Sequence, residues 1–326
     1  MKRLIPTLLS LLSACLLLVQ SSCSTSVTAA GKLQTKTVKL NKFSELDASR
    51  AVEVIFTPQN GSTPKATITA DANIMPYVVV ENRGKGLYVT ISPAIKNISN
   101  ADVTVELTAP CVESISASSG AEVKIVGKHK SKDLSLSASS GGEIKTLDID
   151  ANVVEISGSS GSDVETRNII CTTFNSQFSS GAELEMKKIN ADQTTIQTSS
   201  GSEASISNII AKRMHLSASS GSEIDVDGFN GSDININTSS GASISATGVT
   251  AVTTFVNASS SSDVKISGRS TNITANSSST SDIDLKKLKF DFLNFIASSH
   301  AEISISAALG GKHEGRTSSG GKLKIK

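Results

Sequence analysis

The sequence predicts an all-β fold in which coils of about 20 residues stack into a parallel β-solenoid. The tripeptide Ser-Ser-Gly, or a variant that keeps both serines, occurs eleven times between residues 118 and 320. Its third residue recurs every 20 residues, with one interval of 21 and one of 19. Apolar and polar residues alternate on both sides of it, which is the pattern of strands with one buried face. Aromatic residues make up only 3% of the chain, so thin stacked layers are favoured over a core of large side chains.

This tripeptide, called the marker below, is predicted to form a tight structural corner in each coil. Stacked serine hydroxyls can donate and accept hydrogen bonds along the solenoid axis, so they are expected to satisfy polar groups there. A row of catalytic nucleophiles is disfavoured because no repeat supplies a matching base. The second serine and the glycine of the first seven markers are Ser119, Gly120, Ser140, Gly141, Ser160, Gly161, Ser180, Gly181, Ser200, Gly201, Ser220, Gly221, Ser240 and Gly241. In later markers Ser261, Thr280 and His300 replace the glycine.

The chain divides into four regions. Residues 1–23 are predicted to be a lipoprotein signal peptide, 24–34 a linker, 35–110 less regular β layers that cap the solenoid, and 111–326 the eleven-repeat array. Strands are expected in the cap at 35–40, 52–56, 66–69, 77–80, 87–91 and 102–107. A cap is needed because an open solenoid end is a sheet edge that can polymerise. At the other end, Lys322, Lys324 and Lys326 are expected to protect the last strand, or to form a docking face.

The N-terminal segment is predicted to direct the chain out of the cytoplasm. It has a basic start and an apolar stretch over residues 4–19 that is too short and interrupted for a convincing membrane span. Cys23 is the preferred lipid-anchor residue and Cys15 the alternative, while an ordinary secretory signal cleaved near Ala30 remains a third interpretation. Cys111 and Cys171 fall three coils apart, roughly 14 Å at the strand spacing, so they are expected to be free, buried thiols.

An acidic residue stands two positions after most markers. The alternation points these side chains outward, so they are expected to form a ridge along the solenoid that serves solubility and discourages lateral sheet pairing. Cation or partner binding is the alternative, but one carboxylate per coil supplies few Ca²⁺ ligands. The ridge consists of Glu122, Glu143, Asp163, Glu183, Glu203, Glu223, Asp263, Asp282 and Glu302.

Other chemistry finds little support in the sequence. The four histidines lie in separate repeats and are interpreted as solvated turn residues, and neither a metal-ligand spacing nor a phosphate-binding loop is present. No metal or cofactor is predicted. Net charge is +1, or about −1 without Lys2 and Arg3, so nucleic acid is not an expected partner.

The chain resembles the putative auto-transporter adhesin head GIN domain family of Bacteroidetes-type envelope proteins. The resemblance is carried by the 43–46 and 52–54 segments, the Thr69-Ala70-Asp71-Ala72-Asn73-Ile74 segment, the 87–89 segment and the marker repeats. It implies a right-handed single-stranded parallel β-helix, supports lipid anchoring, and brings no catalytic residues. This chain departs from it in its many near-identical repeats.

These observations favour a non-enzymatic cell-envelope lipoprotein that acts as a rigid interaction or adhesin-like scaffold. It is expected on the periplasmic face of the outer membrane, attached through its lipid and facing an envelope protein or glycan. A β-helical protein that binds or degrades polysaccharide is the alternative. Neither the ligand nor the oligomeric state follows from the sequence.

Overall fold

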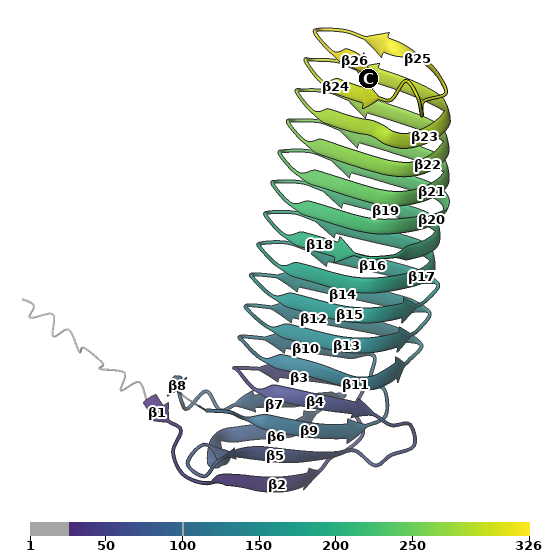
Figure 1. Ribbon diagram of the computed structural model, residues 1–326. Coiled ribbons are helices and arrows are strands. Elements are labelled where there is room, and N and C mark those ends of the chain that lie inside the picture. Colours follow the sequence, from purple (N-terminus) through teal and green to yellow (C-terminus); the bar gives the residue numbers. More distant parts are fainter. Residues whose placement is uncertain (1–25, 100) are drawn as a thin grey trace, which may run out of the picture.

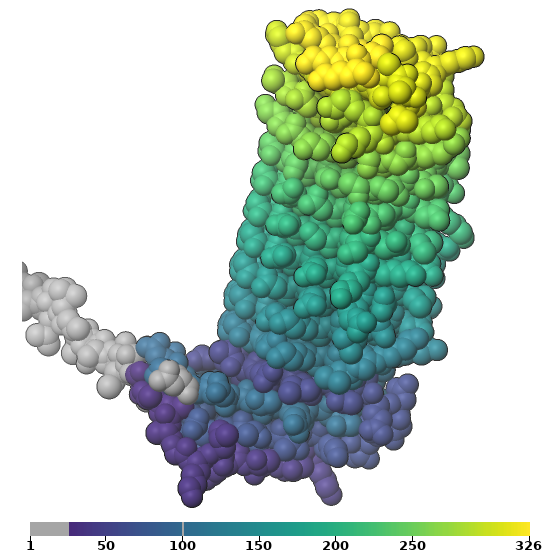
Figure 2. Space-filling model, in the orientation of Figure 1, coloured from purple at the N-terminus to yellow at the C-terminus, as the bar shows by residue number. Residues whose placement is uncertain are grey.

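The computed structural model describes residues 26–99 and 101–326 and confirms the predicted all-β parallel solenoid (Figure 1). The chain runs along the near side, returns along the far side and climbs one layer per coil, which is a right-handed course. Cys15, Cys23 and the signal-peptide range 1–23 lie outside the described residues. Among the residues described, no helix is long and apolar enough to cross a membrane. Cap and coils form one continuous rod (Figure 2).

The N-terminal cap mixes parallel and antiparallel pairing. The expected strands correspond to β2, β4, β5, β6, β7 and β9, and β1 and the start of β2 fall in the range predicted as a linker. β3 and β8 were not among the strands expected from the alternation, although the family resemblance includes a strand at residues 43–46. β3 pairs in parallel with β7 below and β10 above. The elements are β1 (Ser26–Thr28), β2 (Leu33–Lys39), β3 (Glu45–Ser49), β4 (Glu53–Pro58), β5 (Lys65–Asp71), the 3₁₀ helix η1 (Met75–Tyr77), β6 (Val78–Arg83), β7 (Gly86–Ile91), β8 (Asn97–Ser99) and β9 (Thr104–Ala109).

Antiparallel strands close the base of the rod. β2 pairs with β5, and β5 with β9, both antiparallel, so the chain reverses direction beneath the first parallel layer. β2 is the outermost strand and nearly all of its residues are exposed. Because its direction and side chains differ from those of a coil, β2 does not offer the next coil of the stack a matching edge.

Above the cap, every layer repeats the same path. The strands are β10 (Ser114–Ser118), β11 (Glu122–Lys130), β12 (Asp133–Ser139), β13 (Glu143–Asp150), β14 (Val153–Ser159), β15 (Asp163–Ile170), β16 (Thr173–Phe178), β17 (Glu183–Thr198), β18 (Glu203–Ile206), β19 (Ile209–Ala218), β20 (Glu223–Thr238), β21 (Ser243–Ala258), β22 (Asp263–Ser277), β23 (Asp282–Ala297), β24 (Glu302–Ile305), β25 (Lys312–Thr317) and β26 (Lys322–Ile325).

Each coil has three faces. The first face follows the marker, a short second face comes next, and the third face leads to the next marker; in the coil of β17 they are residues 183–186, 188–190 and 193–198. Inward residues stack on their equivalents, as Val164, Leu184 and Ala204 do, with at most 1% of each exposed. A single coil could not bury these side chains, so stacking creates the core.

The marker folds into a type I′ turn. The second serine has φ between 49° and 57° in all eleven copies, and the third residue is also in the left-handed region. The first serine's carbonyl accepts a hydrogen bond from the residue after the glycine, as from Ala182 N–H to Ser179 O at 3.2 Å. Two consecutive left-handed residues are the requirement of this turn, and glycine meets it without steric strain.

Backbone groups, rather than the marker hydroxyls, join successive corners. The N–H of Gly181 donates to the carbonyl of Ser200 in the next coil at 3.2 Å, and equivalent bonds recur along the array. The second serines are exposed. The expected hydroxyl ladder is therefore wrong for the described corners, because hydroxyls that point into water need no protein partner.

A buried serine just after the marker supplies the side-chain hydrogen bonds of the corner. The Ser202 hydroxyl accepts from Ser199 N–H at 3.0 Å and donates to the Phe178 carbonyl of the preceding coil at 2.9 Å. Ser162 and Ser281 make equivalent contacts. Ser222 and Ser262 accept the same backbone bond. In the remaining six coils alanine or glycine fills this position, so the turn forms without the hydroxyl.

Differences in coil length are absorbed at one corner, between the first and second faces, called the second corner below. A regular coil places two residues there between inward positions, such as Thr247 and Gly248. The 21-residue coil has three residues, 126–128, and the 19-residue coil has only Ser267. The marker corner keeps its turn in both irregular coils.

Thr280→Gly tests the strain at the marker corner. Thr280 is exposed and has φ 63°, an unfavourable conformation for a β-branched residue. We expect the substitution to raise the free energy of unfolding by about 1 kcal/mol, since it removes left-handed strain. Thr274→Gly, in a strand, should lower it in the same denaturation series. A destabilised Thr280→Gly variant would contradict the turn assignment.

Candidate functional site

An uncharged polar row runs along the third face. Its members occupy equivalent outward positions, two residues before the first marker serine, and are paired coil to coil by the strand register. The row consists of Ser116, Ser137, Ser157, Gln177, Gln197, Ser217, Asn237, Asn257 and Asn276. This surface, called the neutral row below, contains only hydroxyls and carboxamides over nine successive coils.

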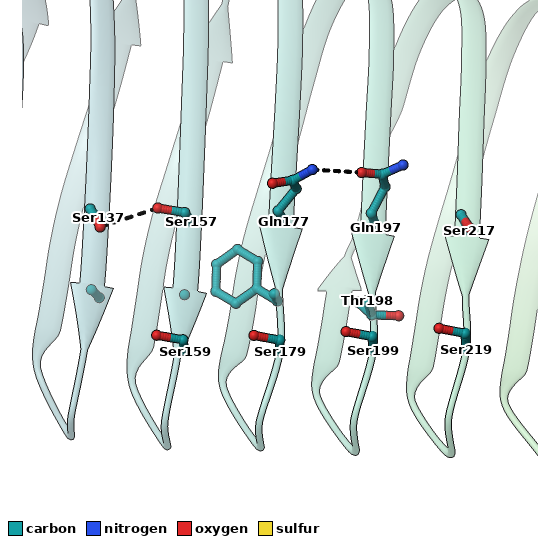
Figure 3. Close-up of a pocket in the computed structure, with 13 residues that line it drawn as sticks. Ser137, Ser157, Ser159, Gln177, Ser179, Gln197, Thr198, Ser199, Ser217 and Ser219 are labelled. Carbon is teal, nitrogen blue, oxygen red and sulfur yellow. Dashed lines mark hydrogen bonds between the residues drawn. The ribbon is translucent and has the colours of Figure 1, made fainter.

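Hydrogen bonds between neighbouring members order the neutral row. Gln177 Nε2 donates to Gln197 Oε1 at 2.9 Å, and the Ser157 hydroxyl to the Ser137 hydroxyl at 3.2 Å (Figure 3). Asn257 Nδ2 donates to Asn237 Oδ1 at 3.0 Å, and Asn276 Nδ2 to Asn257 Oδ1 at 2.9 Å. A carboxamide has two donor hydrogens and two acceptor lone pairs, so each retains hydrogen-bonding capacity for a ligand.

The row borders a shallow hollow of about 460 Å³. Ser159, Ser179, Ser199 and Ser219 line the side where the strands turn (Figure 3). The Phe178 ring packs directly against Gly158, where a Cβ atom would stand only 2.3 Å from the ring. The ring is 2% exposed, so the hollow offers a ligand hydroxyls and amides rather than an aromatic platform.

The structure places all nine predicted ridge carboxylates in one row on the first face. Register pairs connect Glu122 through to Glu302, interrupted by Ser243. Toward the cap, Lys124 contacts Glu53 at 2.7 Å and Glu122 at 3.0 Å, and Lys145 pairs with Glu143. At the other end of the ridge, Lys324 contacts Glu302 at 2.5 Å. Lysines therefore partly neutralise the carboxylates at both ends.

The middle of the ridge keeps its negative charge. Burial raises the pKa of the Glu183 carboxyl, and the charges of Glu203, Asp163 and Glu185 raise it further. Within the part of the chain that the structure describes, no three acidic, His or Cys side chains are arranged to hold a metal ion. The ridges of two neighbouring rods would therefore repel each other.

The two cysteines are free, as expected, but half-buried rather than fully buried. Burial raises the pKa of the Cys171 thiol to about 12, so it remains protonated near neutral pH. Cys111 Sγ accepts a hydrogen bond from Lys130 N–H at 3.3 Å. The environment of Cys171 therefore suits packing, since reactivity requires a thiolate.

His129 contradicts the expectation of a solvated turn residue. The extra residue of the 21-residue coil moves it into an inward position beside Ile149, and it is fully buried. Its Nε2 lies 2.8 Å from the carbonyl of Val112, and its ring packs edge-on against Phe56 with centroids 6.1 Å apart. Nδ1 is buried without a protein partner. Burial lowers the pKa of the imidazole, partly opposed by the Val112 hydrogen bond.

The neutral row was not predicted from the sequence, because the marker and the charged residues form the more conspicuous patterns. The sequence does contain the row: the outward position two residues before the first marker serine is Ser, Gln or Asn in nine successive coils.

The chain belongs to the family described as "Putative auto-transporter adhesin, head GIN domain", whose model matches residues 42–209 and 211–326. This confirms the family resemblance found in the sequence. No curated protein matches the chain.

Solved structures show the same fold at low identity. A putative lipid binding protein from Parabacteroides distasonis is 12% identical, with a TM-score of 0.57 over 93% of this chain and 100% of its own. A putative adhesin from the same organism is 13% identical, with a TM-score of 0.52 over 92% of this chain and 100% of its own. At these identities the likeness concerns fold alone.

His129→Leu tests the buried imidazole. Its folded-state pKa lies below that of the unfolded chain, so the unfolded state takes up the proton first as pH falls. The contribution of His129 to the free energy of unfolding is thus fully present above the unfolded pKa of about 6.5. It decreases as the pH falls below that value, by up to about 1.4 kcal/mol per pH unit. Urea denaturation between pH 5 and 8 should show this slope reduced in His129→Leu and retained in His313→Leu, which alters an exposed histidine. Equal slopes in both variants would exclude His129 as the source.

Proposed function

We propose that this protein is a non-enzymatic cell-envelope lipoprotein whose rigid solenoid binds a partner through the neutral row, in the manner of an adhesin-like scaffold. The single observation that carries this proposal is the uninterrupted uncharged row on the third face. Membership of a family described as putative adhesins supports an adhesive role.

The chemistry of the row favours a neutral glycan as the partner. A polysaccharide offers many hydroxyls that donate and accept, and the stacked amides and serines offer matching groups without the desolvation cost of a charge. Register repeats these groups at the strand spacing, about 4.8 Å, so a linear ligand along the rod would meet the same set in each coil.

Anchoring through Cys23 would hold the cap close to the outer membrane. Ser26, the first described residue, is three positions beyond Cys23 and begins β1, which pairs with β8 in the cap. Three extended residues span only about 10 Å. The eleven coils, roughly 50 Å at one strand spacing each, would then project the neutral row away from the bilayer. We place the protein on the periplasmic face.

A polysaccharide-degrading enzyme is less well supported. The nine ridge carboxylates lie on the first face, and the hollow on the third face is lined by hydroxyls, amides and Phe178. Glu155, on the third face, lines a neighbouring hollow without a second carboxylate. Glycoside hydrolysis commonly needs two carboxyl groups across one bond, and neither hollow has two. No cofactor is required for binding.

Substitution of Gln177 and Gln197 by alanine tests the neutral row. We expect the mature protein to retain neutral glycans on an array, and the double variant to bind them about thirtyfold more weakly, since each of the two amides contributes on the order of 1 kcal/mol. Glu203→Gln, on the first face, should leave affinity unchanged. Undiminished binding by the double variant, or no retained neutral glycan, would reject the row as the binding surface.

Cys23→Ala tests the anchor separately. Without the thiol that carries the lipid, we expect the protein to move from the membrane pellet to the soluble fraction after cell lysis. Cys15→Ala serves as the matched control and should stay in the pellet. If only Cys15→Ala is released, Cys15 is the anchor; if neither is released, lipidation at these cysteines is wrong.

A further inference from the structure

The single 19-residue coil creates a notch in an otherwise regular corner. Between Ile266 and Gly268 this coil has only Ser267, whereas the coils on either side have two residues at the same place. The shorter chain cannot reach as far outward as its neighbours. The second corner therefore retracts in one layer and remains full above and below it.

The retracted corner opens into a hollow of about 460 Å³. Thr247 of the preceding coil lies on one side, and Lys286 and Lys287 of the following coil on the other. Lys265 and Asp284 stand at its edge, and the buried residues Ala246 and Ile266 lie beneath its floor. The groups that a ligand can reach are therefore polar, and three of them are lysines.

The charge of the notch is positive. Lys286 Nζ contacts Asp284 Oδ2 at 2.8 Å, so this pair is neutral in sum. Among the described residues, Lys265 and Lys287 form no such ion pair, which leaves the notch with two unbalanced positive charges. Lys124 and Lys145 occupy the same register row as Lys265 on the first face, but both contact glutamates.

We propose that this notch binds an oxyanion of an acidic glycan, with the carboxylate, sulfate or phosphate group between Lys265 and Lys287. Ammonium groups attract oxyanions and donate charge-assisted hydrogen bonds to them, and two lysines from successive coils at one retracted corner can act on the same group. The site lies at the second corner, apart from the neutral row on the third face, and stands whether or not that row binds glycan.

The test uses the mature protein and a fluorescent sulfated disaccharide, with binding followed by anisotropy. We expect saturable binding that inorganic sulfate competes away at higher concentration. The Lys265→Gln, Lys287→Gln double variant should bind about tenfold more weakly, the loss expected for about 1.4 kcal/mol of charge-assisted contact. A desulfated disaccharide should not bind at this site. Equal binding of the desulfated probe would overturn the proposal.

Two controls separate the notch from general surface charge. The Lys124→Gln, Lys145→Gln double variant removes the same charge from the same face and should change affinity less than twofold (of the order of 0.4 kcal/mol). Ser267→Trp keeps every lysine but fills the hollow, and should abolish binding while circular dichroism confirms the fold. Equal weakening by both lysine pairs, or full binding by Ser267→Trp, would reject the notch as the site.

Discussion

In-register stacking of successive coils is the constraint on which this structure depends. Each coil gives its backbone hydrogen bonds to the coils above and below, and its inward side chains rest on their equivalents. Chain length between markers must stay nearly constant, because a slip of one residue along a strand would turn its apolar side outward. The type I′ turn at each marker fixes this register, since two left-handed residues reverse the chain within the shortest loop.

The array tolerates length changes at one place only. The second corner is a bend at which the strand register is interrupted, so it can gain or lose a residue without disturbing the rows on either face. Each irregular coil changes the environment of ionisable side chains near its second corner. The longer coil buries His129 beside Phe56, and the shorter coil opens a lysine-walled notch. Departures from an otherwise uniform repeat are thus the positions where this rod acquires distinct properties.

The three faces of the rod differ in electrostatic character. Carboxylates dominate the middle of the first face, where repulsion opposes lateral pairing of two rods, while the neutral row on the third face lacks that repulsion. The ends are also distinct. Antiparallel strands close the base, and the last strands carry Lys322, Lys324 and Lys326 at an exposed edge, as charged edges in β proteins commonly do. The neutral row is therefore the surface through which we propose that the rod meets a partner.

The sequence by itself determined the repeat, the coil length, the inward positions and the acidic row, since all follow from period-two alternation and a fixed spacing. It also indicated β2, β4, β5, β6, β7 and β9 of the cap, while the alternation gave no sign of the shorter strands β1, β3 and β8. Only the tertiary structure decided which hydrogen bonds hold the marker corner, because the left-handed conformation of the second serine is a property of the folded turn. The burial of His129 and the notch at Ser267 depend on which corner absorbs a length change. The stack as a whole decides this, because the strands on the three faces must keep their register with two neighbours and the marker turn needs a fixed length, so only the bend at the second corner can change.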